Sequence, residues 1–302
     1  MFNLADNAIN SQVFFAKGAS DFQIWQKPPG CKMVQILCIG SGSGGGGGTV
    51  GTTTSARKGG GGGASGAIAQ GNFLAFTLPD ILYLQVAQGG LPGVGGASPT
   101  AGGNGALSYV SVRPDITTSN TILVSGAAAA TGGLAGASGT GGTASTVYTG
   151  STLTNLGLAT SNAGQNGASG AISVPGASIT LANIISGGAS GGNTSTAAAF
   201  AGGDITGSGF INTVPGGALG SGATAGGAGS DGYTGSFLLN LGKRDPLFFT
   251  GGSGGGASVS GQGGAGGAGA YGCGGGGGGA GFTGLAGAGG RGGDGLIIIV
   301  CT

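Results

Sequence analysis

The chain has 302 residues, of which 82 are glycine, and it carries nine basic residues, eight acidic residues and no histidine. A net charge of +1 gives no electrostatic reason to expect nucleic acid or an anionic membrane as a partner. The lack of histidine excludes serine–histidine and cysteine–histidine catalysis, and no apolar run is long enough to cross a membrane. We expect a protein that is not an enzyme and has no cofactor, no metal site and no membrane insertion.

Short apolar runs bounded by glycine or proline predict β-strands near both ends of the chain. The clearest, Met33–Ile39, is mostly apolar, which favours a strand buried on both faces. We expect the similar run at residues 296–301 to lie beside it. In chain order, the predicted strands lie at residues 12–16, 22–25, 33–39, 72–77, 81–87, 108–113, 121–124, 236–241, 247–250 and 296–301. No window has helical periodicity, so almost no helix is expected.

The middle of the chain, residues 126–235, is rich in alanine, glycine, serine and threonine and has few charges. Short apolar islands interrupt it at irregular spacing, so it contains no countable repeat. We treat it as a variable part of one glycine-rich domain that covers residues 23–302. Residues 1–22 contain the least glycine and are predicted to be a separate N-terminal attachment segment.

The glycine tract at residues 251–295 determines how the rest of the chain is interpreted. Glycine disfavours a helix, and a sheet made of it has no side chains to pack. Parts of the tract repeat in threes, as in the run GGRGGDG at residues 289–295. Three residues per turn is the period of polyproline II, which makes no internal hydrogen bonds. The tract is therefore either a flexible linker or one of several parallel-lying segments joined by lateral hydrogen bonds.

Two further glycine blocks, at residues 40–48 and 59–63, favour the second interpretation. Ordering so much glycine costs on the order of tens of kcal/mol, which dense lateral hydrogen bonding and apolar packing must offset. We therefore predict an all-β fold, with β-sandwich or jelly-roll-like sheets packed against glycine-rich polyglycine II or irregular segments.

The four cysteines are expected to be small buried apolar residues. None forms a CxxC pair, so a zinc site is not predicted. A bridge between Cys38 and Cys301, or between Cys31 and Cys273, is left open.

The charged and glycine motifs indicate little chemistry. Residues 42–47 match GxGxxG, but no helix and no acidic residue follow at the distance a dinucleotide site needs. The basic pair Arg57 and Lys58 is interpreted as solvated loop charge. Arg291 and Asp294, three residues apart, are expected to form a surface ion pair.

Isolated aromatic residues are the candidates for binding. Each of them either fills a small core or stands at a loop tip, where it stacks on sugars or grips a protein surface. The candidates for receptor binding are Tyr148, Phe200, Phe210 and Tyr233. The candidates for attachment to a larger particle are Phe14, Phe15, Phe22 and Trp25.

Several motifs follow one another in order. A strand that ends in Trp25 precedes a Pro–Gly turn, and Met33–Ile39 then runs into the glycines of residues 40–48. Next come Arg57–Lys58, the block 59–63, Leu78–Pro79, the strand 81–87 with Gly89–Gly90, and the closing run 289–299. This succession resembles the glycine-rich domain of bacteriophage tail-fibre and other virion proteins. It is more distantly similar to glycine-rich phage adhesins with stacked polyglycine II helices.

The resemblance implies a virion structural protein, assembled in the host cytoplasm and then extracellular. It favours a tail or fibre tip protein in host-surface recognition. The implied partners are other virion proteins and a host surface glycan or outer-membrane protein, and a homo-oligomer is compatible with it. Two alternatives stay open: a capsid decoration or vertex protein with an architectural role, and an ice-binding polyglycine II bundle.

Overall fold

The computed structural model describes residues 10–18, 20–52, 54–126, 129–147, 158–207, 212–221, 224–232, 248–282 and 284–302. The regular structure of these residues is β, apart from one 3-10 turn, η1 (Ala75–Thr77). The strands are β1 (Asn10–Phe15), β2 (Phe22–Gln26), β3 (Met33–Ile39), β4 (Val50–Gly51), β5 (Ile68–Leu74), β6 (Ile81–Gln85), β7 (Tyr109–Ser111), β8 (Thr121–Val124), β9 (Ala159–Asn162), β10 (Ile179–Thr180), β11 (Ile205–Thr206), β12 (Gly281–Phe282) and β13 (Leu296–Cys301). The predicted all-β class is confirmed.

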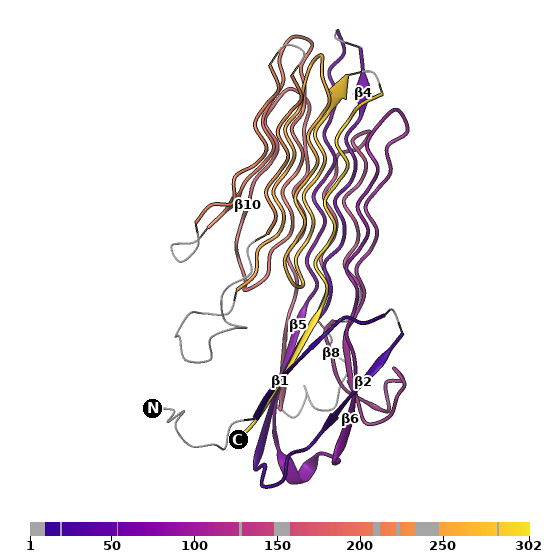
Figure 1. The fold of residues 1–302 in the computed structure, drawn as a ribbon, viewed down its shortest axis with the longest axis vertical. Coiled ribbons are helices and arrows are strands. Elements are labelled where there is room, and N and C mark those ends of the chain that lie inside the picture. Colours follow the sequence, from indigo (N-terminus) through magenta and orange to yellow (C-terminus); the bar gives the residue numbers. More distant parts are fainter. Residues whose placement is uncertain are drawn as a thin grey trace.

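Two antiparallel sheets form one end of the molecule, and the glycine-rich segments extend from them (Figure 1). The larger sheet has the order β1-β13-β3-β5-β9 and the smaller has the order β2-β6-β7-β8. Their facing sides share one apolar core, in which Val34 and Ile297 of the larger sheet join Leu84 and Val110 of the smaller one. The two sheets therefore pack as a sandwich. β3 alternates exposed and buried residues from Met33 to Ile36 and is buried on both faces only towards Ile39, whereas β13 is buried along almost its whole length.

The closing strand lies where the sequence predicts it. β13 pairs with β3 along its whole length, with Leu296 opposite Ile39 and Cys301 opposite Val34. Its other edge pairs with β1, from Phe15 opposite Leu296 to Asn10 opposite Cys301. The last part of the predicted attachment segment thus forms an edge strand of the larger sheet.

The strand predicted at residues 72–77 begins and ends earlier than expected. β5 starts at Ile68 and continues through Gly71, because the Phe73 ring lies where a side chain at position 71 would be, 2.6 Å from an added Cβ. Such coverage by an aromatic ring offsets the missing packing of a strand glycine. The chain then turns into η1, whose carbonyl at Ala75 accepts a hydrogen bond from Lys27 Nζ at 3.0 Å.

The glycine-rich segments carry the three-residue period in their hydrogen bonds. Within residues 44–47, the amides of the first three residues each donate to a different neighbouring segment. The amide of the fourth residue donates to the same neighbouring segment as the first. The acceptors are, in turn, the carbonyls of Gly103, Gly290, Gly61 and Thr100. Hydrogen bonds leave at three directions around the axis, as three residues per turn require. We call these laterally bonded segments the glycine-rich bundle.

Residues 274–280 lie at the centre of this bundle. Their flanking segments lie at residues 43–49, 60–66, 186–192, 252–258, 264–267 and 287–293. Three of the six accept hydrogen bonds from the central segment, and the other three donate to its carbonyls. A Cβ added at Gly277 would overlap the carbonyl oxygen of Gly60, and each of the glycines at 274–279 is likewise too close to backbone of a neighbouring segment for a side chain. An uninterrupted glycine run therefore specifies a segment surrounded on every side.

In segments at the edge of the bundle, every third residue faces solvent. In residues 287–294 the glycines are buried, whereas Arg291 is exposed and Asp294 is half-buried. Arg291 Nη2 lies 2.6 Å from Asp294 Oδ1, which confirms the predicted ion pair. The variable middle also joins the bundle, and its apolar residues Ile179, Ile205 and Val214 form a small core between segments.

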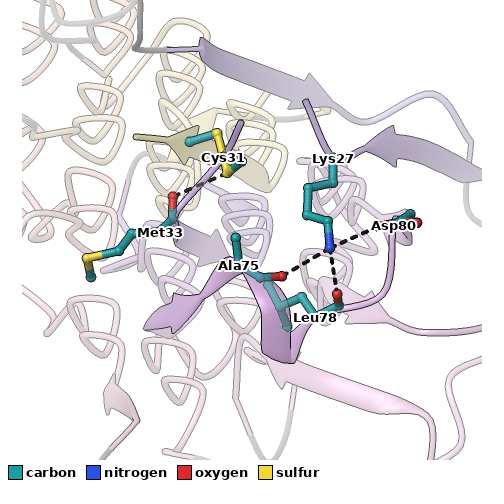
Figure 2. Close-up of a disulfide and its surroundings, with 7 residues drawn as sticks. Lys27, Cys31, Met33, Ala75, Leu78 and Asp80 are labelled. Atoms are coloured by element: carbon teal, nitrogen blue, oxygen red, sulfur yellow. Dashed lines mark hydrogen bonds and ion pairs between the residues drawn. A yellow bond between two sulfur atoms is a disulfide. The ribbon is translucent and has the colours of Figure 1, made fainter. Parts of the chain in front are cut away.

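Two of the cysteines are the small buried residues that the sequence predicts, and the other two form a bridge that it does not. Cys31 and Cys301 form a disulfide, with their Cα atoms 5.7 Å apart (Figure 2). Neither bridge left open by the sequence forms, because Cys38 and Cys273 are both buried and free. Cys31 precedes β3 and Cys301 ends the neighbouring antiparallel strand β13, so the two meet at the same end of the sheet. Only the strand pairing brings together residues separated by 270 positions.

Candidate functional site

The candidate site is the end of the glycine-rich bundle that lies farthest from the two sheets. The short strands β4 and β12 pair there, and the turns between bundle segments gather around them (Figure 1). The opposite end holds β1, the disulfide and Thr302, whose carbonyl accepts from the amide of Lys32. We call the first end the distal end and the other the sheet end.

Arg57 anchors the distal end, which corrects the prediction of a solvated loop charge. Its side chain is buried, with a relative exposure of 4%. The guanidinium donates to the carbonyls of Gly281, Val259 at 3.1 Å and Ser55 at 3.2 Å, and to Thr194 Oγ1 at 3.1 Å. A planar group with five fixed donors is suited to hold several acceptors at set angles. Arg57 thus joins turns that are remote in the sequence.

The acceptors around Arg57 are uncharged, and neither ion pair formed by the described residues includes it. Burial removes water from the guanidinium and lowers the pKa of Arg57 below its ordinary value. The positive charge is instead stabilised by carbonyl and hydroxyl dipoles. Sequence reasoning missed this role because a basic pair beside a glycine block is typical of a solvated loop. The one available indication was its place immediately before residues 59–63, which lie inside the bundle.

Lys58 holds a second turn at the distal end. Its Nζ donates to the carbonyl of Ser138 at 3.2 Å. That residue belongs to a turn in which the amides of Ser138 and Gly139 both donate to the carbonyl of Ala135. Adjacent basic residues therefore position different turns from one point on the chain.

Among the predicted receptor-binding residues, Phe200 lies beside this site. Its amide donates to the carbonyl of Asn193 at 3.0 Å, and its carbonyl accepts from the amide of Ala257 at 3.0 Å. The side chain is half-buried, directly after the turn in which Ser195 caps the amides of Ala197 and Ala198. Tyr148, Phe210 and Tyr233 lie outside the described residues.

The predicted attachment residues lie at the sheet end and differ in exposure. Trp25 is 1% exposed and belongs to the core between the two sheets, so it offers no surface to a partner and is withdrawn as a contact. Phe14 and Phe22 are half-buried, and Phe14 packs against that same core. Phe15 is 43% exposed, and its ring centroid lies 5.7 Å from that of Tyr271.

The described side chains of the site hold turns in place through hydrogen bonds to backbone carbonyls. The described residues contain no group of three or more residues that could hold a metal ion. No helix among them is long and apolar enough to span a membrane. The amides of the GxGxxG match at residues 42–47 donate to carbonyls of neighbouring bundle segments, so they are already occupied.

Compared with known proteins, the chain matches no family model and has no significant similarity to a curated sequence.

Proposed function

We propose that this chain is a virion structural protein that binds the host surface through the turns at its distal end. The observation that carries the proposal is that the distal turns and the chain's sheet end lie at opposite ends of one axis. The glycine-rich bundle holds turns from many parts of the chain at one end, and both β1 and Thr302 lie at the other. Binding residues are commonly displayed on loops that a rigid scaffold positions.

The bundle is a suitable scaffold for such turns. Its interior amides are satisfied by neighbouring segments, so the segments are tied to one another at every turn of the helix. Turns at the ends of these segments are free to differ in sequence without changing the lateral bonds. We therefore assign host recognition to the distal turns and attachment to the sheet end, where Phe15 remains a candidate contact.

The alternative of an ice-binding face has weaker support. Thr140, Thr143 and Thr146 are exposed at three-residue spacing along one edge segment. The segment beside it, however, presents Leu134, and Thr131 Oγ1 accepts the amide of Thr143 at 2.7 Å. A flat lattice of equivalent small side chains is therefore absent from this described face.

Exchange of the distal turns tests the proposal. Residues 195–199 and 135–139 are replaced by unrelated polar turns of equal length, in particles that carry the variant chain. We expect the adsorption rate constant to fall about tenfold or more, with particle yield and morphology preserved. An equal-length exchange of residues 115–119, at the sheet end, is the control. Unchanged adsorption by intact distal-turn variants would contradict the recognition role, and finding the chain on the capsid by cryo-EM would support the architectural alternative instead.

A further inference from the structure

A groove on the flank of the bundle has no role in the proposal above. It holds about 300 Å³ and lies among residues 231–232, 268–271 and 291–294. Its side-chain lining comprises Asp231, Tyr271, Arg291 and Asp294, together with two alanines. The residues that form it come from three neighbouring segments near the sheets, not from the distal turns.

Backbone forms the floor of the groove. Gly232 donates its amide to the carbonyl of Ala268 at 2.7 Å, and Gly269 donates to the carbonyl of Arg291 at 2.9 Å. These bonds hold the three segments side by side. Because the glycines have no side chains, the floor stays low and the larger side chains stand around it.

The polar side chains of the groove are held by hydrogen bonds on one side and are open on the other. Asp231 Oδ1 accepts the amide of Ala268 at 2.7 Å. Asp294 Oδ1 accepts the amide of Gly89 at 2.7 Å and Arg291 Nη2 at 2.6 Å. Among the described residues, neither Oδ2 atom nor the Tyr271 hydroxyl has a hydrogen-bond partner. The groove thus presents acceptors and donors whose positions are already set.

Tyr271 is held by two aromatic rings. The centroids of Phe15 and Phe249 each lie 5.7 Å from its own, and the Phe249 ring meets it edge-on at 78°. A side chain ordered before binding loses less entropy when a ligand arrives. The half-buried ring therefore gives the groove a rigid apolar wall.

We infer that this groove binds a neutral pyranose unit of a saccharide. Sugar hydroxyls both donate and accept, so they match carboxylate acceptors beside a guanidinium donor. The C–H face of a pyranose suits an aromatic wall, and the volume is that of a small ligand site. Two aspartates against one arginine leave the lining with a net negative charge, which disfavours anionic ligands.

The same composition argues against a divalent cation. Oxygen-liganded cations take six or more ligands, and here Arg291 is paired to one of the two carboxylates.

The inference goes beyond the proposed function, because the groove is on the flank and the distal turns contribute nothing to it. The two therefore fail independently: loop exchange leaves the groove intact, and groove variants leave the distal turns intact.

Ligand-observed NMR on the full chain tests the inference. The probes are the methyl α-pyranosides of glucose, galactose and mannose, with N-acetylneuraminic acid as the anionic comparison. We expect saturation transfer and a Kd on the order of 1 mM for at least one neutral probe. Asp231→Asn, Arg291→Gln and Tyr271→Phe should each weaken that binding about tenfold. Tyr271→Phe keeps the ring packing, so it separates loss of the hydroxyl from loss of fold.

Asp115→Asn and Arg113→Gln are the matched controls, since both residues lie in the turn between β7 and β8 at the sheet end, away from the groove; Arg113 is exposed and Asp115 is half-buried. They should leave the Kd unchanged within about twofold. The inference is overturned by any of three results: no transfer from any neutral probe at about 10 mM, equal binding by the groove variants, or tighter binding of the anionic sugar.

Discussion

Cys31 and Cys301 join the entrance of β3 to the end of β13, across 270 positions of the sequence. The bridge closes almost the whole chain into one loop at the sheet end, where β1, β3 and β13 lie side by side. Lys27 lies near it and donates to the carbonyls of Ala75 and Leu78 at 3.0 and 2.9 Å (Figure 2). Covalent and polar contacts together therefore fix the end of the sheets that lies away from the bundle.

Removal of the disulfide should destabilise the protein. A bridge that closes a long loop restricts the unfolded chain, and losing one costs about 2–5 kcal/mol. We expect Cys31→Ser to lower the free energy of unfolding by that amount in urea denaturation. A reducing agent should lower the free energy of unfolding of the wild-type protein by a similar amount and leave that of the variant unchanged. If reductant shifts both proteins equally, the effect does not come from this bridge.

The two free thiols should be inert in the native state. Burial raises the pKa of Cys273 to about 12, with a smaller opposing effect of the Ser186 amide, and burial alone raises the pKa of Cys38. A thiolate is the reactive form, so iodoacetamide at about pH 8.5 should label neither residue until the chain is unfolded. Rapid native labelling, detected by mass spectrometry, would contradict the buried placement.

The same shifts give a direction to the pH dependence. The folded pKa values lie above those of the unfolded thiols, so the unfolded state loses its protons first as the pH rises. Their contribution to stability is fully present below the unfolded pKa, about 8.5, and decreases as the pH rises from there towards 12. The urea midpoint should therefore fall between about pH 9 and 11, and less steeply in Cys273→Ala.

Replacement of Arg57 should loosen the distal end. Arg57→Ala leaves the carbonyls of Gly281 and Val259 without these donors, and we expect a loss of about 2–4 kcal/mol. Hydrogen exchange should quicken at β4 and β12 more than at β3. Arg113→Ala, at an exposed arginine, should change stability by less than about 0.5 kcal/mol. Equal effects of the two substitutions would remove the anchoring role.

Glycine at the bundle centre should not tolerate a methyl group. In Gly277→Ala the new Cβ overlaps backbone of Gly60, which cannot move without breaking lateral bonds. We expect destabilisation of about 3 kcal/mol or more, or failure to fold. Gly170→Ala is the matched control, because its nearest neighbour would be a side-chain atom of Asn193 at 3.2 Å. Similar thermal unfolding of the two variants would contradict the packing described for residues 274–280.

Much of the sheet end was predictable from local pattern. Apolar runs bounded by glycine and proline located β3, β8 and β13, and the pairing of β3 with β13 is confirmed. Trp25 was misassigned to the surface because an aromatic residue in a short alternating strand looks the same on either face. Its burial follows from the smaller sheet lying over the larger one, which no local pattern records.

The sequence by itself determined the all-β class and which segments are surrounded. Runs of almost pure glycine mark segments that are surrounded by the backbone of other segments. Runs in which every third residue has a larger side chain mark segments at the edge of the bundle. Only the tertiary structure decided which segment lies against which. Every glycine offers the same amide donor and the same carbonyl acceptor, so a glycine segment can pair with any neighbouring segment. The same holds for Arg57 and for the Cys31–Cys301 bridge, whose partners are remote in the chain and meet only after the segments have stacked.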